Sequence, residues 1–79
     1  MKLKMIRKTP QQQMTYVLRR CALELHHDGE FARLADEMGV SPSTLSRWCR
    51  NGFMPRTKAR WLERRFGTLV PVDRITRRR

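Results

Sequence analysis

Apolar residues in the first third of the chain recur at intervals of three and four, the spacing of one helical face. They follow Thr9-Pro10-Gln11-Gln12, which has the form of a capping box with proline at the first helical position. The pattern predicts an amphipathic helix that begins near Pro10 and turns one apolar stripe inward. That stripe consists of Met14, Val17, Leu18, Cys21, Ala22 and Leu25.

Residues 31–50 carry a denser pattern, in which helically spaced apolar residues stand on both sides of one glycine. Leu34, Ala35 and Met38 precede Gly39, and Val40, Leu45 and Trp48 follow it. Gly39 can adopt the positive φ that ends a helix, and the small Ala35 lets two helices cross closely. We therefore expect a helix from about Glu30 to Met38, after the Asp28-Gly29 break, then a tight turn and a second helix.

The start of that second helix is strongly specified. Ser41 can cap it, Pro42 suits its first position, and Val40 can staple onto Leu45. Asn51-Gly52 supplies its end.

The remaining residues predict supporting elements. Pro55 can start another helix, in which Ala59, Leu62 and Phe66 face inward until Gly67. Residues 68–75 fit either a short strand or a last helical turn, since Pro71 interrupts the apolar run. The fold expected is all-α: a compact bundle of four to five helices containing a helix-turn-helix. Residues 9–76 form this domain, between a basic arm (1–8) and a basic tail (77–79).

One side of the predicted helix over 42–51 is polar. Its residues, here called the polar face, are Ser43, Ser46, Arg47 and Arg50. Short hydroxyl side chains allow a helix backbone to approach the major groove, and arginines can donate two hydrogen bonds to guanine or clamp phosphates. The alternative is an ordinary solvated helix face. The complete turn signature beside it favours contact with bases or phosphates.

Residues 31–50 resemble the helix-turn-helix of the phage lambda repressor and Cro superfamily. The small fifth residue, the ninth-position glycine and the apolar fourth, eighth, tenth, fifteenth and eighteenth residues all match. The continuation over 48–55, followed by Ala59, Leu62-Glu63 and Phe66-Gly67, is similar to the Cro-like antitoxin and phage regulator subgroup. The resemblance covers about residues 30–70. It departs at Phe31 and Ala32, where many members have a glutamine that holds a phosphate.

This resemblance implies a phage or prokaryotic transcriptional regulator, a repressor that binds an operator in double-stranded DNA through the helix over 42–51. A homodimer, in solution or on DNA, is expected because one module reads only a few base pairs. Residues 68–75 are the first candidate for its interface. The resemblance also places the loop and helix after the motif beside the groove. The candidate phosphate contacts are Ser41, Thr44, Asn51, Arg56, Lys58 and Arg60.

Charge agrees with a polyanionic partner. The 79 residues carry a formal net charge of +11, which attracts DNA, RNA and anionic membranes alike. The charge is segregated, however: residues 24–37 hold five acids and one arginine, whereas residues 38–79 hold eleven basic residues and two acids. Such a division suits a protein that docks on a duplex in one orientation.

Both chain ends are basic, and each either contacts DNA as an arm or stays solvated. The arm residues are Lys2, Lys4, Arg7, Lys8, Arg77, Arg78 and Arg79. The alternation over residues 2–7 also allows a strand paired within a dimer.

Other chemistry finds little support in the sequence. Cys21 and Cys49 are expected as reduced thiols, although Cys21 with His26 and His27 leaves a zinc site as a weaker alternative. Trp61 either packs against the helices or stacks on bases. We expect no cofactor, no metal, no catalysis, no membrane span and a cytoplasmic, nucleoid-associated location.

Two other function classes stay open. One is an antitoxin-type module that binds a small protein partner and regulates itself through DNA. The other is a basic RNA-binding protein.

Overall fold

Five helices and no strands make up the part of the chain that the computed structural model describes, residues 9–67 and 70–76. They are α1 (Pro10–Leu25), α2 (Phe31–Met38), α3 (Pro42–Asn51), α4 (Arg56–Phe66) and α5 (Val72–Ile75). The expected all-α bundle is confirmed. The two arms, Thr68 and Leu69 lie outside the described residues.

Helix α1 lies at the centre of the packing and touches each of the other four helices. Its capping box is formed: the Gln12 amide donates to Thr9 Oγ1 over 3.1 Å, and the Thr9 amide donates to Gln12 Oε1 over 3.0 Å. Five of the six residues predicted for its apolar stripe are buried, and Leu25 is half-buried against them. The helix therefore supplies one wall of the core to all its neighbours.

Helices α2 and α3 are joined by the turn Gly39–Val40–Ser41. Gly39 has φ of +74°, the left-handed conformation that its position predicts. Ser41 Oγ then accepts a hydrogen bond from the Thr44 amide over 3.2 Å, and Pro42 is the first residue of α3. Leu34, Ala35, Leu45 and Trp48 are buried between the two helices and α1.

The carboxyl end of α3 lies against the amino end of α1. Gly52 has φ of +86°, and a Cβ built there would lie 2.8 Å from Pro10 Cβ. No side chain fits at this position without a shift of the neighbouring helix. Glycine is thus required at residue 52 both for the turn and for the closeness of α1 and α3.

The ambiguous segment ends in a helical turn, α5, and the strand alternative is wrong for residues 70–76. The Met54 amide donates to the Ile75 carbonyl over 2.9 Å, which ties α5 to the loop before α4. Val70 and Ile75 are 4% and 1% exposed. These side chains belong to the core of this chain, so they are not available to cover a second copy. Val70 and Ile75 are therefore not available to the dimer interface predicted over residues 68–75, and Leu69 lies outside the described residues.

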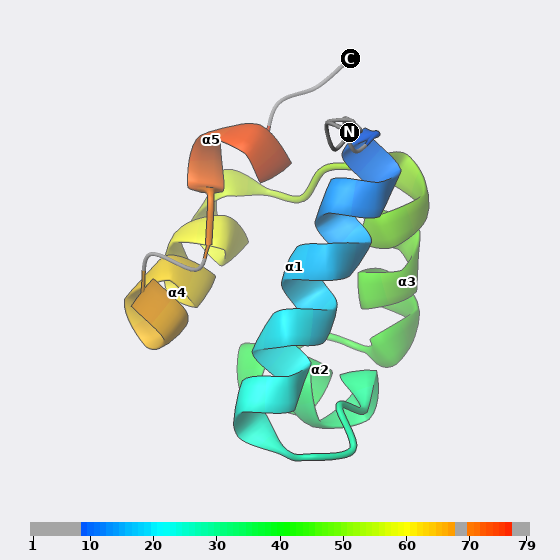
Figure 1. Ribbon diagram of the computed structural model, residues 1–79, viewed down its shortest axis with the longest axis vertical. Coiled ribbons are helices and arrows are strands. Elements are labelled where there is room, and N and C mark those ends of the chain that lie inside the picture. The colour runs from blue at the N-terminus through cyan, green and yellow to red at the C-terminus, as the bar shows by residue number, and fades with distance from the viewer. Residues whose placement is uncertain (1–8, 68–69, 77–79) are drawn as a thin grey trace, which may run out of the picture.

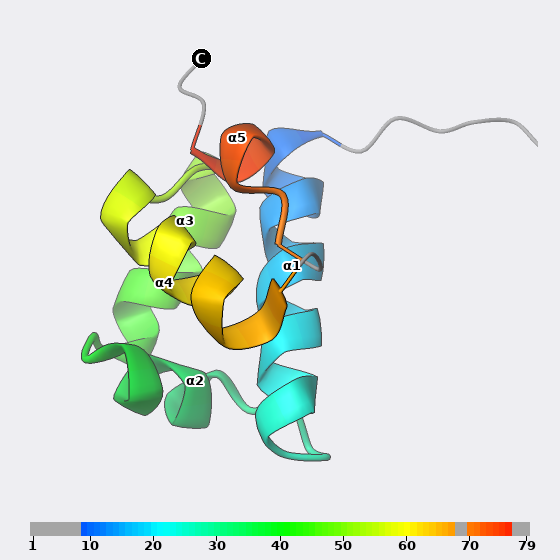
Figure 2. The same cartoon turned by 90° about the vertical axis from the view of Figure 1, so that its left-hand side faces the viewer.

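Helix α1 lies between two groups of helices (Figure 1). Helix α3 forms the right-hand edge in this view, α4 and α5 lie on the left, and α1 crosses in front between them. Figure 2 agrees, since α4 is nearest the viewer there and α3 lies behind it. Helix α3 packs on α1 and α2, whereas α4 packs on α1 and α5.

The two turn glycines make a matched pair for a stability test. Gly39→Ala should cost about 1 kcal/mol, since a Cβ there meets no atom within 4 Å and only the left-handed backbone is penalised. Gly52→Ala should cost at least about 2 kcal/mol, because the collision with Pro10 adds to the same penalty. Chemical denaturation measures both. Equal losses would contradict the close approach of α1 and α3.

Candidate nucleic-acid interface

All four residues of the polar face are exposed on α3. They lie opposite Leu45 and Trp48, which are 0% and 7% exposed. Because successive residues in a helix are turned by about 100°, positions 43, 46, 47 and 50 fall within one third of the helix circumference. The structure thus brings the predicted residues together on one side of a rigid helix.

The first turn of α3 fixes the orientation of this surface. Ser41 Oγ bonds to the Thr44 amide and lies 3.0 Å from Thr44 Oγ1. Both hydroxyls, predicted as phosphate contacts, therefore already take part in the helix cap. Asn51 is exposed at the other end of α3. The start of α3, like the amino end of any helix, favours anions.

Acidic side chains are absent from α3 and cluster nearby instead. Five acids occur between residues 24 and 37, and all five are exposed on or beside α1 and α2. The Glu30 backbone amide, and secondarily His26, hold the pKa of the Asp28 carboxyl below its usual value. The polar face of α3 therefore has no acidic residue on its own helix, and most of the acidic residues lie on or beside α1 and α2.

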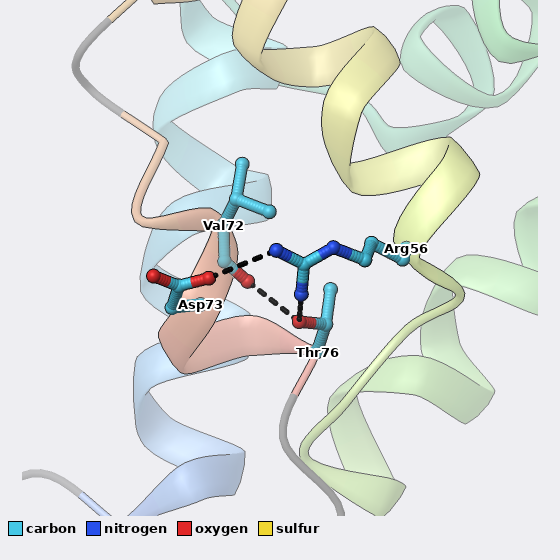
Figure 3. Close-up of polar contacts among 4 residues, drawn as sticks. All are labelled: Arg56, Val72, Asp73 and Thr76. Atoms are coloured by element: carbon cyan, nitrogen blue, oxygen red, sulfur yellow. Dashed lines mark hydrogen bonds and ion pairs between the residues drawn. The ribbon is translucent and has the colours of Figure 1, made fainter.

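Arg56 is engaged within the chain (Figure 3). Its guanidinium donates to Asp73 Oδ1 over 3.1 Å and to Thr76 Oγ1 over 3.4 Å, and Thr76 Oγ1 in turn donates to the Val72 carbonyl. These contacts connect α4 to α5. The ion pair is well exposed, with 55% and 80% of the two side chains accessible, so it contributes little to stability.

Lys58 also has an internal role that its sequence position did not indicate. Its ammonium donates to the Met38 carbonyl over 3.2 Å, in a partly buried contact. The lysine thereby caps the carboxyl end of α2 from α4, next to the turn into α3. Only the tertiary structure could place it there, since the two residues are twenty positions apart.

Arg60 lines a shallow hollow between α4 and α5, together with Arg56, Glu63 and Arg74. This hollow is not part of the polar face, because α3 and α4 lie on opposite sides of the molecule (Figures 1 and 2). The six predicted phosphate contacts are therefore divided. Ser41, Thr44 and Asn51 adjoin the polar face, while Arg56 and Arg60 lie on the α4–α5 side and Lys58 bridges to α2.

The other candidate groups take up structural positions. Cys21 is fully buried, and this burial, with the nearby Glu24, raises the pKa of its thiol to about 12 although Arg20 opposes the rise. Trp61 is half-buried against the core. His26 and His27 stack on each other, and His26 Nδ1 lies 3.0 Å from Asp28.

Within residues 9–67 and 70–76, no three His, Cys, Asp or Glu side chains gather as a metal site would require. In the same part of the chain no helix has the length and apolarity needed to cross a membrane.

Comparisons of the chain with protein-family models, with curated proteins and with solved structures found no match.

Lys58→Met should destabilise the fold by about 1 kcal/mol, because it leaves the Met38 carbonyl without its charged donor. Arg60→Met, on the exposed side of the same helix, should change stability by less than about 0.5 kcal/mol. Thermal denaturation of the two variants compares their stabilities. A loss at Lys58 no larger than at Arg60 would show that the bond to Met38 is not stabilising.

The two thiols should differ in reactivity. At pH 8 iodoacetamide should modify the half-buried Cys49 in the folded protein and leave Cys21 unmodified, because only the thiolate reacts and Cys21 is buried as a thiol. In denaturant both should react. Mass spectrometry of the alkylated peptides measures this, and equal labelling of the folded chain would contradict the burial of Cys21.

Proposed function

We propose that this protein is a sequence-specific transcriptional regulator that binds double-stranded DNA with the polar face of α3. The observation that carries the proposal is the arrangement of that helix. It begins at a capped serine-proline pair after a glycine turn, it is anchored by Leu45 and Trp48, and it presents Arg47 and Arg50 with two serines on its outer side.

The size and chemistry of this surface fit the major groove. A helix of ten residues is about 15 Å long, and its exposed side chains are short near the start and long near the end. Arg47 and Arg50 are one turn apart, so each can address a different base pair. Ser43 and Ser46 allow close approach and can donate or accept hydrogen bonds.

Charge supports a fixed orientation on the duplex. With five of the seven acids on or beside α1 and α2 and none on α3, the potential guides the polar face towards phosphates. The resemblance of residues 31–50 to the lambda repressor and Cro superfamily points to the same function and adds the expectation of repression at an operator. On this proposal Ser41, Thr44 and Asn51 position the backbone, and the polar face reads bases.

Two basic residues of α4 have a different expected role from the one that the sequence suggested. Arg56 and Lys58 were predicted as contacts to phosphates, but both are bonded within the chain. Replacement of Lys58 should therefore act mainly through the α2–α3 turn, whereas replacement of the well-exposed Arg56 should disturb the fold little.

Selection from a random duplex pool, followed by footprinting, tests the proposal. Arg47→Ala and Arg50→Ala should each cost about 1–3 kcal/mol of binding to the selected site and relax base preference at one position. Arg64→Ala, exposed on α4, removes the same charge and should leave base preference unchanged.

A double Arg47→Ala and Arg50→Ala variant with full selectivity would contradict the proposal. So would tighter binding to structured RNA than to the selected duplex at matched salt, an outcome that would favour the RNA-binding alternative.

A further inference from the structure

Helices α4 and α5 carry more exposed positive charge than the polar face of α3. In the part of the chain that the structure describes, five arginines on these two helices are exposed, against two on the polar face. The five are Arg56, Arg60, Arg64, Arg65 and Arg74. The same helices carry two acids, Glu63 and Asp73. The proposed function uses none of the five arginines, so it leaves this charge without a role.

Part of this charge lines the hollow between α4 and α5. The hollow has a volume of about 480 Å³, and its charged lining residues are Arg56, Arg60, Glu63, Asp73 and Arg74. Arg64 is four residues beyond Arg60, so it is turned by only about 40° from Arg60 and lies about 6 Å further along α4. We call Arg60, Arg64 and Arg74 the outer arginines.

The acid on α5 already has a partner within the chain. Asp73 accepts a hydrogen bond from Arg56 over 3.1 Å (Figure 3). Within residues 9–67 and 70–76, by contrast, the guanidinium groups of the outer arginines form no ion pair. Three cations therefore stand at and beside a concave surface in which Glu63 is the single acid without an ion pair in that part of the chain. Such a surface attracts anions from solution.

We propose that the outer arginines bind the phosphate backbone of a second DNA duplex, so that one chain bridges two segments of DNA. The occupant of α3 in such a bridge rests on the proposed function. The contact at the outer arginines does not require it, because phosphates are bound there without any reading of bases.

The type of cation favours phosphate. Among the described residues every exposed Lys or Arg side chain is an arginine, and the one lysine, Lys58, is bonded to the Met38 carbonyl. A guanidinium presents a planar fork of donors that matches a phosphate with two parallel hydrogen bonds. A duplex carries a phosphate every 3.4 Å along each strand, roughly, so arginines about 6 Å apart can each meet one.

The position of the outer arginines calls for a second duplex and not a continuation of the first. Helix α1 stands between α3 and α4, which lie on opposite sides of the molecule (Figures 1 and 2). The fold measures 29 Å along its middle axis, which runs across Figure 1. A duplex has a persistence length of about 500 Å, so it does not fold back around so small a body. The two surfaces therefore meet different segments.

A capture assay tests the bridge directly. The selected duplex is fixed to beads at low density, saturated with the chain, washed, and offered a fluorescent duplex of random sequence. The parent chain should retain the second duplex, and the retained amount should fall as salt rises. The triple variant Arg60→Gln, Arg64→Gln and Arg74→Gln should retain at least about tenfold less, although it still binds the fixed duplex.

A second triple variant provides the matched control. Arg19→Gln, Arg20→Gln and Arg33→Gln remove the same charge from exposed positions on α1 and α2, and this chain should retain the second duplex as the parent does. Equal losses in the two triple variants, equal retention by all three chains, or no retention by the parent chain would overturn the inference. Poly-glutamate that displaces the second duplex better than unlabelled random duplex does, at equal charge, would assign this surface to an acidic protein instead.

The salt dependence of binding counts the phosphates that are contacted. In an Arg47→Ala and Arg50→Ala background, residual binding to random duplex should persist. Addition of the three outer substitutions should lower the slope of log affinity against log salt by about 2 to 3, close to one for each phosphate. Addition of the three control substitutions should change the slope by less than about 1. An equal change in both cases contradicts the inference.

These measurements separate the inference from the proposed function. If the outer substitutions lower the salt slope as expected but the Arg47→Ala and Arg50→Ala chain keeps full selectivity, the outer arginines bind duplex DNA and the proposed function fails. If the polar face reads the selected duplex and the outer substitutions change neither retention nor slope, the inference alone fails.

Discussion

Burial of one apolar stripe on α1 is the constraint on which the other features depend. A chain of this size can build only a small core, and here the same helix faces α2, α3, α4 and α5. Every other helix is positioned by its contact with that stripe. The polar face of α3 is therefore oriented by residues of α1 that never approach it, such as Leu18 and Cys21 at 0% exposure.

Helices α1 and α3 approach each other closely at Gly52. The residue ends α3, turns the chain towards α4 and leaves room for Pro10. The amino end of α1 and the carboxyl end of α3 are consequently held at a fixed distance. Under the proposed function this fixed distance would keep the polar face in register with base edges, since a displaced side chain loses its hydrogen bonds to a base.

Basic residues serve two different purposes in this chain. On α3, Arg47 and Arg50 are exposed and belong to the surface proposed to meet DNA. On α4, Arg56 donates a hydrogen bond to Asp73 and Lys58 donates one to the Met38 carbonyl. These bonds connect α5 and the α2–α3 turn to α4. These contacts leave the net charge of +11 unchanged, since that value already subtracts Asp73 and the Met38 carbonyl is neutral, but they fix where the two basic groups lie.

The sequence by itself determined the elements that depend on local spacing and capping. The stripe of α1, the turn at Gly39, the cap at Ser41 and the grouping of Ser43, Ser46, Arg47 and Arg50 all follow from helical periodicity and from the backbone preferences of glycine, proline and serine. Contacts between distant residues were decided by the tertiary structure. Lys58 and Met38 are twenty positions apart, and Ile75 bonds to Met54 across twenty-one. The helical turn at 72–75 and the burial of Val70 and Ile75 depend on which surfaces the packing covers, and periodicity within one segment carries no information about its neighbours.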